Sequence, residues 1–122
     1  MKNILLVEDE ENLVQIVGSV LEEEGYHVQR STSAEEALKL LPNYRPDLII
    51  SDLKMGEMDG FEMIEQIRKE TPTKQIPFIY VTSFDDADSA RKAKNLGATA
   101  YITKPFDLDE LLRVIRSALN PS

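Results

Sequence analysis

The chain has 122 residues, of which 42% are hydrophobic and 30% are charged, the size and balance of one ordinary globular domain. We therefore predict a single domain over residues 1–122 and no effector domain. Twenty-two acidic against fourteen basic residues give a formal net charge of -8. Such a charge repels phosphate backbones and argues against direct nucleic-acid binding. Cysteine is absent and histidine occurs once, which excludes disulfide frameworks and the usual zinc sites.

The sequence also bears on the cellular compartment. No apolar run approaches the roughly 20 residues that span a bilayer, and the opening residues turn acidic at Glu8, too soon for a secretory signal. The lack of cysteine fits a reducing compartment. We predict a cytoplasmic protein that does not contact membranes.

Short apolar runs alternate with amphipathic stretches along the chain. A weak strand is expected around Val28, and stronger ones at residues 4–7, 48–50, 78–81 and 100–102. Helical spacing of apolar residues predicts a first helix over residues 11–24, with Gly25 after its end. The other predicted helices open with Ser33 and Glu36, Asp59 and Glu62, Asp86, and Asp107 and Glu110. The helix from Asp86 offers only an alanine face, so we expect it to bury less apolar surface and to be the most mobile.

Alternation of strand and helix over five units predicts an α/β fold with a doubly wound parallel sheet, because parallel strands need crossover helices. In such sheets ligands bind outside the carboxyl ends of the strands. Polar residues follow every strong strand at this edge, namely Glu8 and Asp9, Asp52, Thr82 and Ser83, and Lys104.

Three carboxylates at one edge repel one another unless a proton or a cation neutralises them. Mg2+, or Mn2+, suits this set because it prefers oxygen ligands. A carboxylate beside a divalent cation, a hydroxyl and an ammonium can accept a phosphoryl group. Chemistry alone leaves Asp9 or Asp52 as the nucleophile and favours Asp52, because the adjacent acids Glu8 and Asp9 suit metal coordination.

These segments resemble the receiver domains of two-component response regulators, and the resemblance covers essentially the whole chain. The matching segments are residues 5–10 (LLVEDE), 47–60 (DLIISDLKMGEMDG), 81–83 (VTS) and 97–106 (GATAYITKPF). The resemblance implies a flavodoxin-like (βα)5 fold with strand order 2-1-3-4-5, the order typical of this family. The alternation of strands and helices by itself does not specify that order.

The resemblance also implies roles for individual residues. Asp52 is then the phosphorylation site, Glu8 and Asp9 hold Mg2+ together with Asp52, and the backbone carbonyl of Lys54 completes the protein ligands. Lys104 pairs with the phosphoryl oxygens, Thr82 moves to hydrogen-bond them, and Tyr101 is the switch aromatic. The Lys104–Pro105 bond is expected to be cis.

Four positions depart from the common family pattern or vary within it. Glu8 stands where Asp is frequent, which suggests a water-mediated contact with the metal, and Gly56 stands where Pro is usual, which suggests a looser loop. Lys54 and Phe84 occupy positions that tune phosphate lifetime, and we hypothesise that their side chains shield the acyl phosphate from water.

By resemblance, the phosphoryl donor is a sensor histidine kinase or a histidine phosphotransfer protein, docking near Leu13, Ile16, Pro105 and Phe106. The signal would leave through the face made by the fourth helix, fifth strand and fifth helix, toward an unknown downstream protein. The chain is expected to be a monomer or a weak phosphorylation-dependent dimer. It is not expected to be an enzyme beyond its own phosphorylation and dephosphorylation.

Two rival functions remain open. A Mg2+-dependent aspartyl-phosphate phosphatase usually carries a general acid two residues after its nucleophile, where this chain has Lys54. A phosphorylation-independent scaffold of the same fold would be expected to lose one of the site residues, and all of them are present.

Overall fold

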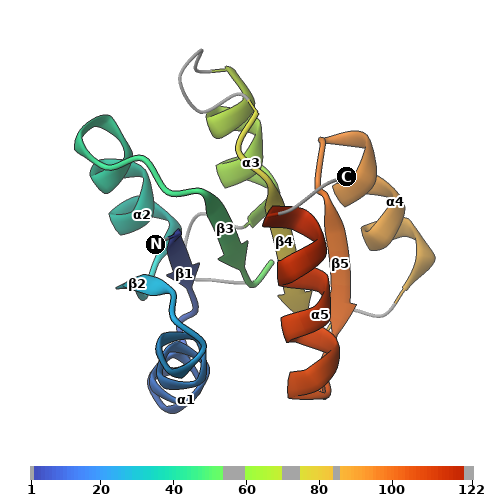
Figure 1. Cartoon of the computed structure of the whole chain (residues 1–122). Helices are drawn as coiled ribbons and strands as arrows, with labels where there is room; N and C mark the ends of the chain where they lie inside the picture. Colours follow the sequence, from blue (N-terminus) through green and yellow to red (C-terminus); the bar gives the residue numbers. More distant parts are fainter. Residues whose placement is uncertain (1, 54–59, 70–74, 84–85, 120–122) are drawn as a thin grey trace.

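The computed structural model describes residues 2–53, 60–69, 75–83 and 86–119 (Figure 1). Strands and helices alternate along these residues. The strands are β1 (Asn3–Val7), β2 (His27–Ser31), β3 (Leu48–Ser51), β4 (Phe78–Thr82) and β5 (Ala100–Thr103). The helices are α1 (Glu11–Glu23), α2 (Ala34–Leu40), the 3-10 turn η1 (Leu41–Asn43), α3 (Gly60–Lys69), α4 (Ala87–Asn95) and α5 (Leu108–Leu119).

The strands form one parallel sheet in the order β2-β1-β3-β4-β5. The order reverses between β1 and β3, because the chain first adds β2 on one side of β1 and then places β3 on the other. Val7 on β1 pairs in register with Ser51 on β3, and Thr82 on β4 pairs with Thr103 on β5. The predicted fold class and strand order are therefore confirmed.

The two faces of the sheet carry separate apolar cores, as alternation along the strands requires. On one face, Leu5 and Tyr80 pack with apolar residues of α2, α3 and α4, including the fully buried Ile64. On the other, Ile4 and Ile79 pack with those of α1 and α5. Figure 1 shows the helices distributed on the two sides of the sheet in this way. Since both faces are covered, the central strands β1, β3 and β4 are almost entirely buried.

Helices α2 and α4 begin where their capping residues predict. The Ser33 hydroxyl accepts a hydrogen bond from the backbone N–H of Glu36, and the Asp86 carboxylate accepts one from that of Ser89. Gly25 follows α1 with a φ of 96°, the left-handed conformation that favours glycine. The start signal expected at Asp59 lies outside the described residues.

Helix α4 packs through small residues. Ala93 is its one buried residue within Ala87–Asn95, whereas α3 buries four residues and α5 buries three. The weak apolar contact predicted for this helix is confirmed, and its predicted mobility stays a prediction. Within the described ranges, no helix is long and apolar enough to cross a membrane.

Candidate functional site

The site lies at the carboxyl edge of the sheet, on both sides of the strand-order reversal. Glu8 directly follows β1, Asp52 follows β3, and Lys104 follows β5, while Thr82 is the last residue of β4. The register of β1 against β3 sets the Glu8 and Asp52 positions side by side. Parallel strands thus deliver residues from four distant parts of the chain to one edge.

Three carboxylates converge there. Oxygen atoms of Glu8, Asp9 and Asp52 all lie within 4.8 Å of one another. Glu8 and Asp52 are 5% and 9% exposed, while Asp9 is open to solvent. The predicted acidic cluster therefore forms, with Glu8 and Asp52 buried at the edge of the sheet and Asp9 exposed to solvent.

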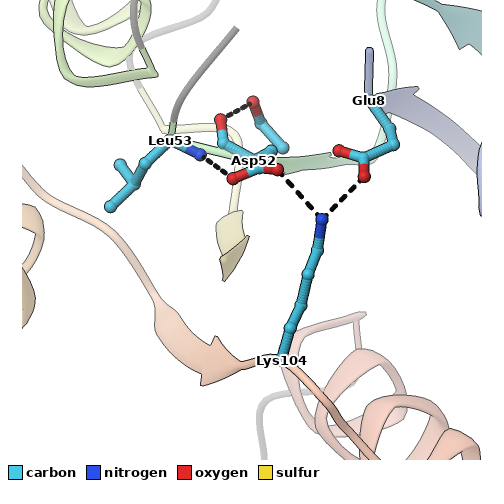
Figure 2. A network of polar contacts seen from close by, with 5 residues as sticks. Glu8, Asp52, Leu53 and Lys104 are labelled. Carbon is cyan, nitrogen blue, oxygen red and sulfur yellow. Dashed lines mark hydrogen bonds and ion pairs between the residues drawn. The ribbon is translucent and has the colours of Figure 1, made fainter. Parts of the chain in front are cut away.

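The Lys104 ammonium lies between two of these carboxylates (Figure 2). Its Nζ donates to Glu8 Oε1 at 2.7 Å and to Asp52 Oδ2 at 2.9 Å. Both are charge-assisted hydrogen bonds within a largely buried group, where electrostatic interactions are stronger than in water. The Glu8 carboxylate thus contacts Lys104 directly, and its predicted water-mediated contact with the metal stays a prediction.

The Asp52 carboxylate is also held from its other side. Oδ1 accepts a hydrogen bond from the backbone N–H of Leu53 at 2.6 Å, and the backbone N–H of Asp52 donates to the Val7 carbonyl at 3.2 Å. The carboxylate is therefore oriented by Leu53 and Lys104 together (Figure 2). The Leu53 amide was missed at the sequence level because every residue but proline carries such a donor, so no residue type signals it.

The pKa values in this pocket move in the same direction. Burial raises the pKa of Glu8 to about 7, against the opposing effect of the Lys104 ammonium. Burial lowers the pKa of Lys104, but hydrogen bonds to Glu8 and Asp52 and their negative charge outweigh it, so the net shift is upward. Both shifts mean that Glu8 and Lys104 hold their protons more tightly in this pocket than they would in water. Independently of these shifts, three carboxylate groups face one ammonium here, so the site is short of positive charge even with Lys104 in place.

A divalent cation would offset this shortage. All donor atoms of the cluster are carboxylate oxygens, the ligand type of a hard divalent cation such as Mg2+ or Mn2+. Glu8, Asp9 and Asp52 would hold the ion. The residues present therefore fit the metal that the acidic pattern predicts.

The remaining predicted residues lie on or directly after β4 and β5. Thr82 is buried at the end of β4, and its carbonyl accepts a 2.7 Å hydrogen bond from the backbone N–H of Lys104. Tyr101 lies on β5, half-buried, with its ring at the edge of Tyr80. The Lys104–Pro105 peptide bond is cis, as expected.

Some expectations lie outside the described residues. They concern the Lys54 carbonyl as a metal ligand, the loop around Gly56, and the shielding role of Lys54 and Phe84. These stay predictions.

An apolar pocket adjoins the charged cluster. Leu13 and Val17 of α1 line it together with Phe106 and Leu111, and Glu8, Asp52 and Lys104 are also among its lining residues. Ile16, which precedes Val17 on α1, is 58% exposed. The site therefore joins a polar centre to apolar surface formed by α1 and the segment before α5.

Comparisons with known proteins point to one family. The family model of the response regulator receiver domain matches residues 4–116. The transcriptional regulatory protein GlrR of Escherichia coli is 38% identical over 120 residues, which cover 98% of this chain and 27% of that protein. An uncharacterized 14.6 kDa protein of Leptolyngbya boryana is 36% identical over 114 residues, covering 93% of this chain and 87% of that protein. The chain spans about a quarter of the length of GlrR.

Solved structures show the same fold. The chemotaxis response regulator CheY4 of Vibrio cholerae superposes with a TM-score of 0.92 at 32% identity, covering 98% of this chain and 99% of that one. The non-phosphorylated HemR receiver domain of Leptospira biflexa gives 0.90 at 34% identity, with coverages of 100% and 97%. Together with the family match over residues 4–116, this means that the chain belongs to the receiver domains of two-component response regulators.

Proposed function

We propose that this chain is a phosphoacceptor switch in which Asp52 accepts a phosphoryl group from a phosphohistidine donor. One observation carries the proposal: the Asp52 carboxylate lies among the oxygens of Glu8 and Asp9 and is hydrogen-bonded by the Lys104 ammonium. A buried acid arranged in this way can act as a nucleophile and has a cation ready for the transferred oxygens. The domain would catalyse only its own phosphorylation and dephosphorylation.

The chemical step is a substitution at phosphorus. A bond forms between an Asp52 carboxylate oxygen and phosphorus while the bond from phosphorus to the donor imidazole nitrogen breaks. The imidazole keeps the electron pair of that bond and gains a proton from water, so charge and atoms balance. Lys104 then pairs with the new phosphoryl oxygens, and Thr82 turns to hydrogen-bond them.

Glu8, Asp9 and Asp52 would hold Mg2+ or Mn2+, joined by the Lys54 carbonyl. When bound, the cation neutralises negative charge on the transferring oxygens. Lys104 is already committed to Glu8 and Asp52, so its single positive charge does not offset three carboxylates. This charge balance supports the need for a divalent ion.

The signal would leave through the face made by α4, β5 and α5. Thr82 ends β4, and Lys104 directly follows β5. Capturing a phosphoryl group therefore pulls on both segments that flank α4. Ala93 is the one buried residue of α4 within Ala87–Asn95, so this helix has little buried apolar contact to lose when it moves. A downstream protein would read the altered face. The names of relatives such as GlrR suggest transcription control as the output of proteins of this kind.

The donor protein would dock on the apolar surface beside the site. Ile16 is exposed on α1, and the partly buried Leu13 and Phe106 lie at the adjoining pocket. A sensor histidine kinase or a histidine phosphotransfer protein would cover this surface while presenting its phosphohistidine to Asp52.

Incubation with phosphoramidate and Mg2+, followed by intact mass measurement, tests the proposal. A single added phosphoryl group that is absent from Asp52→Asn and from the chelated sample supports the switch. Continuous phosphate release without an accumulating adduct supports the rival phosphatase instead. A chain that folds and binds Mg2+ but never gains mass supports the scaffold and overturns the proposal. Asp47→Asn is the matched control, since Asp47 lies at the opposite end of β3.

A further inference from the structure

Tyr80 occupies the centre of an aromatic cluster in the sheet. It is fully buried in the middle of β4, two residues before Thr82. Its ring centroid lies 4.8 Å from that of Phe78, 6.0 Å from Phe61 and 6.3 Å from Tyr101. Tyr80 and Tyr101 are direct partners in the β4–β5 register. The edge-to-face pair across these strands makes Tyr80 part of the wall against which the Tyr101 ring rests.

The other end of the Tyr80 side chain is tied to the backbone beside the phosphoacceptor. Its hydroxyl donates a hydrogen bond to the Gly60 carbonyl at the start of α3. The Gly60 N–H in turn donates to the Leu53 carbonyl at 2.6 Å. These two bonds join β4 to the residue that immediately follows Asp52.

Gly60 is packed tightly between these partners. A Cβ atom at this position would lie 2.7 Å from the Asp52 carbonyl oxygen and 2.9 Å from both the Leu53 Cα and the Tyr80 ring. Two of these neighbours are backbone atoms, which cannot turn aside. Contact is therefore continuous from the Asp52 backbone, through Gly60, to the Tyr80 ring and on to Tyr101.

We infer that Tyr80 is a positioning residue that couples the backbone at Asp52 to the ring of Tyr101. The inference rests on the proposed phosphoacceptor function. It deepens that function by naming a link from the site to β5 that runs through Gly60 and Tyr80 and does not involve the Thr82 side chain. A displacement of Gly60 or of the Asp52 backbone moves the Tyr80 ring, because the hydroxyl bond and the rings around it leave the side chain little freedom. The Tyr101 ring then has to find a new position against it.

The hydroxyl distinguishes this role from plain packing. Phe78 fills the same core two residues earlier in the strand without any polar atom. A hydroxyl placed in such a core is unfavourable unless it is hydrogen-bonded, so phenylalanine would fill the space at lower cost. At position 80, tyrosine adds a hydroxyl that is hydrogen-bonded to the Gly60 carbonyl.

Fluorine NMR of protein labelled with 3-fluorotyrosine tests the inference. The chain has four tyrosines and no tryptophan, so four signals are expected, assigned with single Tyr→Phe variants. Phosphoramidate and Mg2+ are added to the parent chain and to Tyr80→Phe, and the adduct is counted by mass in the same samples. We expect both to gain one phosphoryl group, and the displacement of the Tyr101 signal in Tyr80→Phe to fall to half or less of that in the parent. Tyr44→Phe, in which a half-buried tyrosine without a ring contact to Tyr80 or Tyr101 is changed, should keep the full displacement.

The outcomes separate the inference from the function on which it rests. An adduct with equal displacement of the Tyr101 signal in the parent and in Tyr80→Phe overturns the coupling and leaves the function intact, whereas no adduct in the parent overturns the function itself. A second measurement needs no folded Tyr80 variant. In the parent, the Tyr80 signal, assigned by elimination from the other three variants, must shift with the same time course as the Tyr101 signal. A Tyr80 signal that stays in place as the adduct forms contradicts the inference.

Discussion

The Lys104 ammonium and the Asp52 carboxylate are joined by a 2.9 Å hydrogen bond although 52 positions separate them in the sequence. The bond exists because β3 and β5 end at the same edge of the sheet, with only β4 between them. It places a positive charge at the proposed phosphoacceptor before any phosphoryl group arrives, so the site is preorganised for the charge that the reaction brings.

Replacing Lys104 should slow phosphorylation without removing the nucleophile. Lys104→Met keeps the length of the side chain and loses the ammonium. Charge-assisted hydrogen bonds contribute about 1.5–3 kcal/mol, so we expect the phosphorylation rate to fall roughly 10- to 150-fold. Intact mass against time, at fixed phosphoramidate and Mg2+, measures it. Lys39→Met, at an exposed position of α2, is the control, and equal rates in parent and Lys104→Met would remove Lys104 from the mechanism.

Mg2+ should stabilise the folded chain through the carboxylate cluster. A ligand at 100 times its dissociation constant adds about 2.7 kcal/mol to the free energy of unfolding when only the folded state binds it. We expect Mg2+ to raise the melting temperature of the parent, chelation to reverse this, and Glu8→Gln/Asp9→Asn to abolish it. Glu23→Gln/Glu24→Gln changes another adjacent pair of acids, at the exposed end of α1. An equal Mg2+ response in the two double variants contradicts a site at Glu8 and Asp9.

Gly60→Ala should disturb the site through space alone. The new Cβ meets backbone atoms of Asp52 and Leu53 below 3.0 Å, and overpacking of this kind typically costs about 1–3 kcal/mol. We expect a lower urea midpoint and slower phosphorylation. Gly25→Ala is the matched comparison, because a Cβ there meets nothing within 4 Å but the φ of +96° is strained. It should lower the midpoint and leave the phosphorylation rate unchanged.

Arg68 should contribute to stability by joining two segments at the opposite edge of the sheet. Its guanidinium donates to the Ile76 carbonyl at 2.6 Å and to the Gly97 carbonyl at 2.8 Å. The group is half-buried, so we expect Arg68→Met to lower the free energy of unfolding by on the order of 2 kcal/mol in urea titrations. Arg68→Lys should recover only part of this loss, because an ammonium lacks the planar fork that reaches both carbonyls. Arg116→Met on the exposed face of α5 should change little, and a similar loss there would count against a specific role for Arg68.

The α4 cap should give a pH dependence of known sign. The hydrogen bond from the backbone N–H of Ser89 lowers the pKa of Asp86 below its ordinary value of 3.8. The folded chain therefore binds fewer protons at Asp86 than the unfolded chain, so the cap stabilises fully above about pH 4 and loses this contribution as pH falls through the lowered pKa. Asp86→Asn keeps a capping oxygen that does not titrate. The stability of the parent relative to this variant should decline as the solution is acidified below that range, measured by urea unfolding at each pH, and a constant difference would show that the carboxylate charge plays no part.

Local features of the fold were predictable from local sequence. The capping bond of Ser33, the cap at Asp86 and the glycine after α1 all appear where residue types indicated them, since capping involves residues only a few positions apart. The polar residues at the strand ends were also identified, because strands and their ends can be read from apolar runs. The strand order came from family resemblance, since alternation of strands and helices permits more than one order.

Distances between remote side chains were decided by the tertiary structure alone. The sequence determined that Glu8, Asp52 and Lys104 would reach one edge of a parallel sheet, but not that Lys104 would lie between the two acids. Nothing in the local sequence distinguishes Tyr80 from a packing residue, whereas the β4–β5 register places it opposite Tyr101 and α3 brings the Gly60 carbonyl to its hydroxyl. The physical reason is that periodicity and capping encode interactions within a few residues. Register, crossover and close packing arise only when segments far apart in the chain exclude water between them.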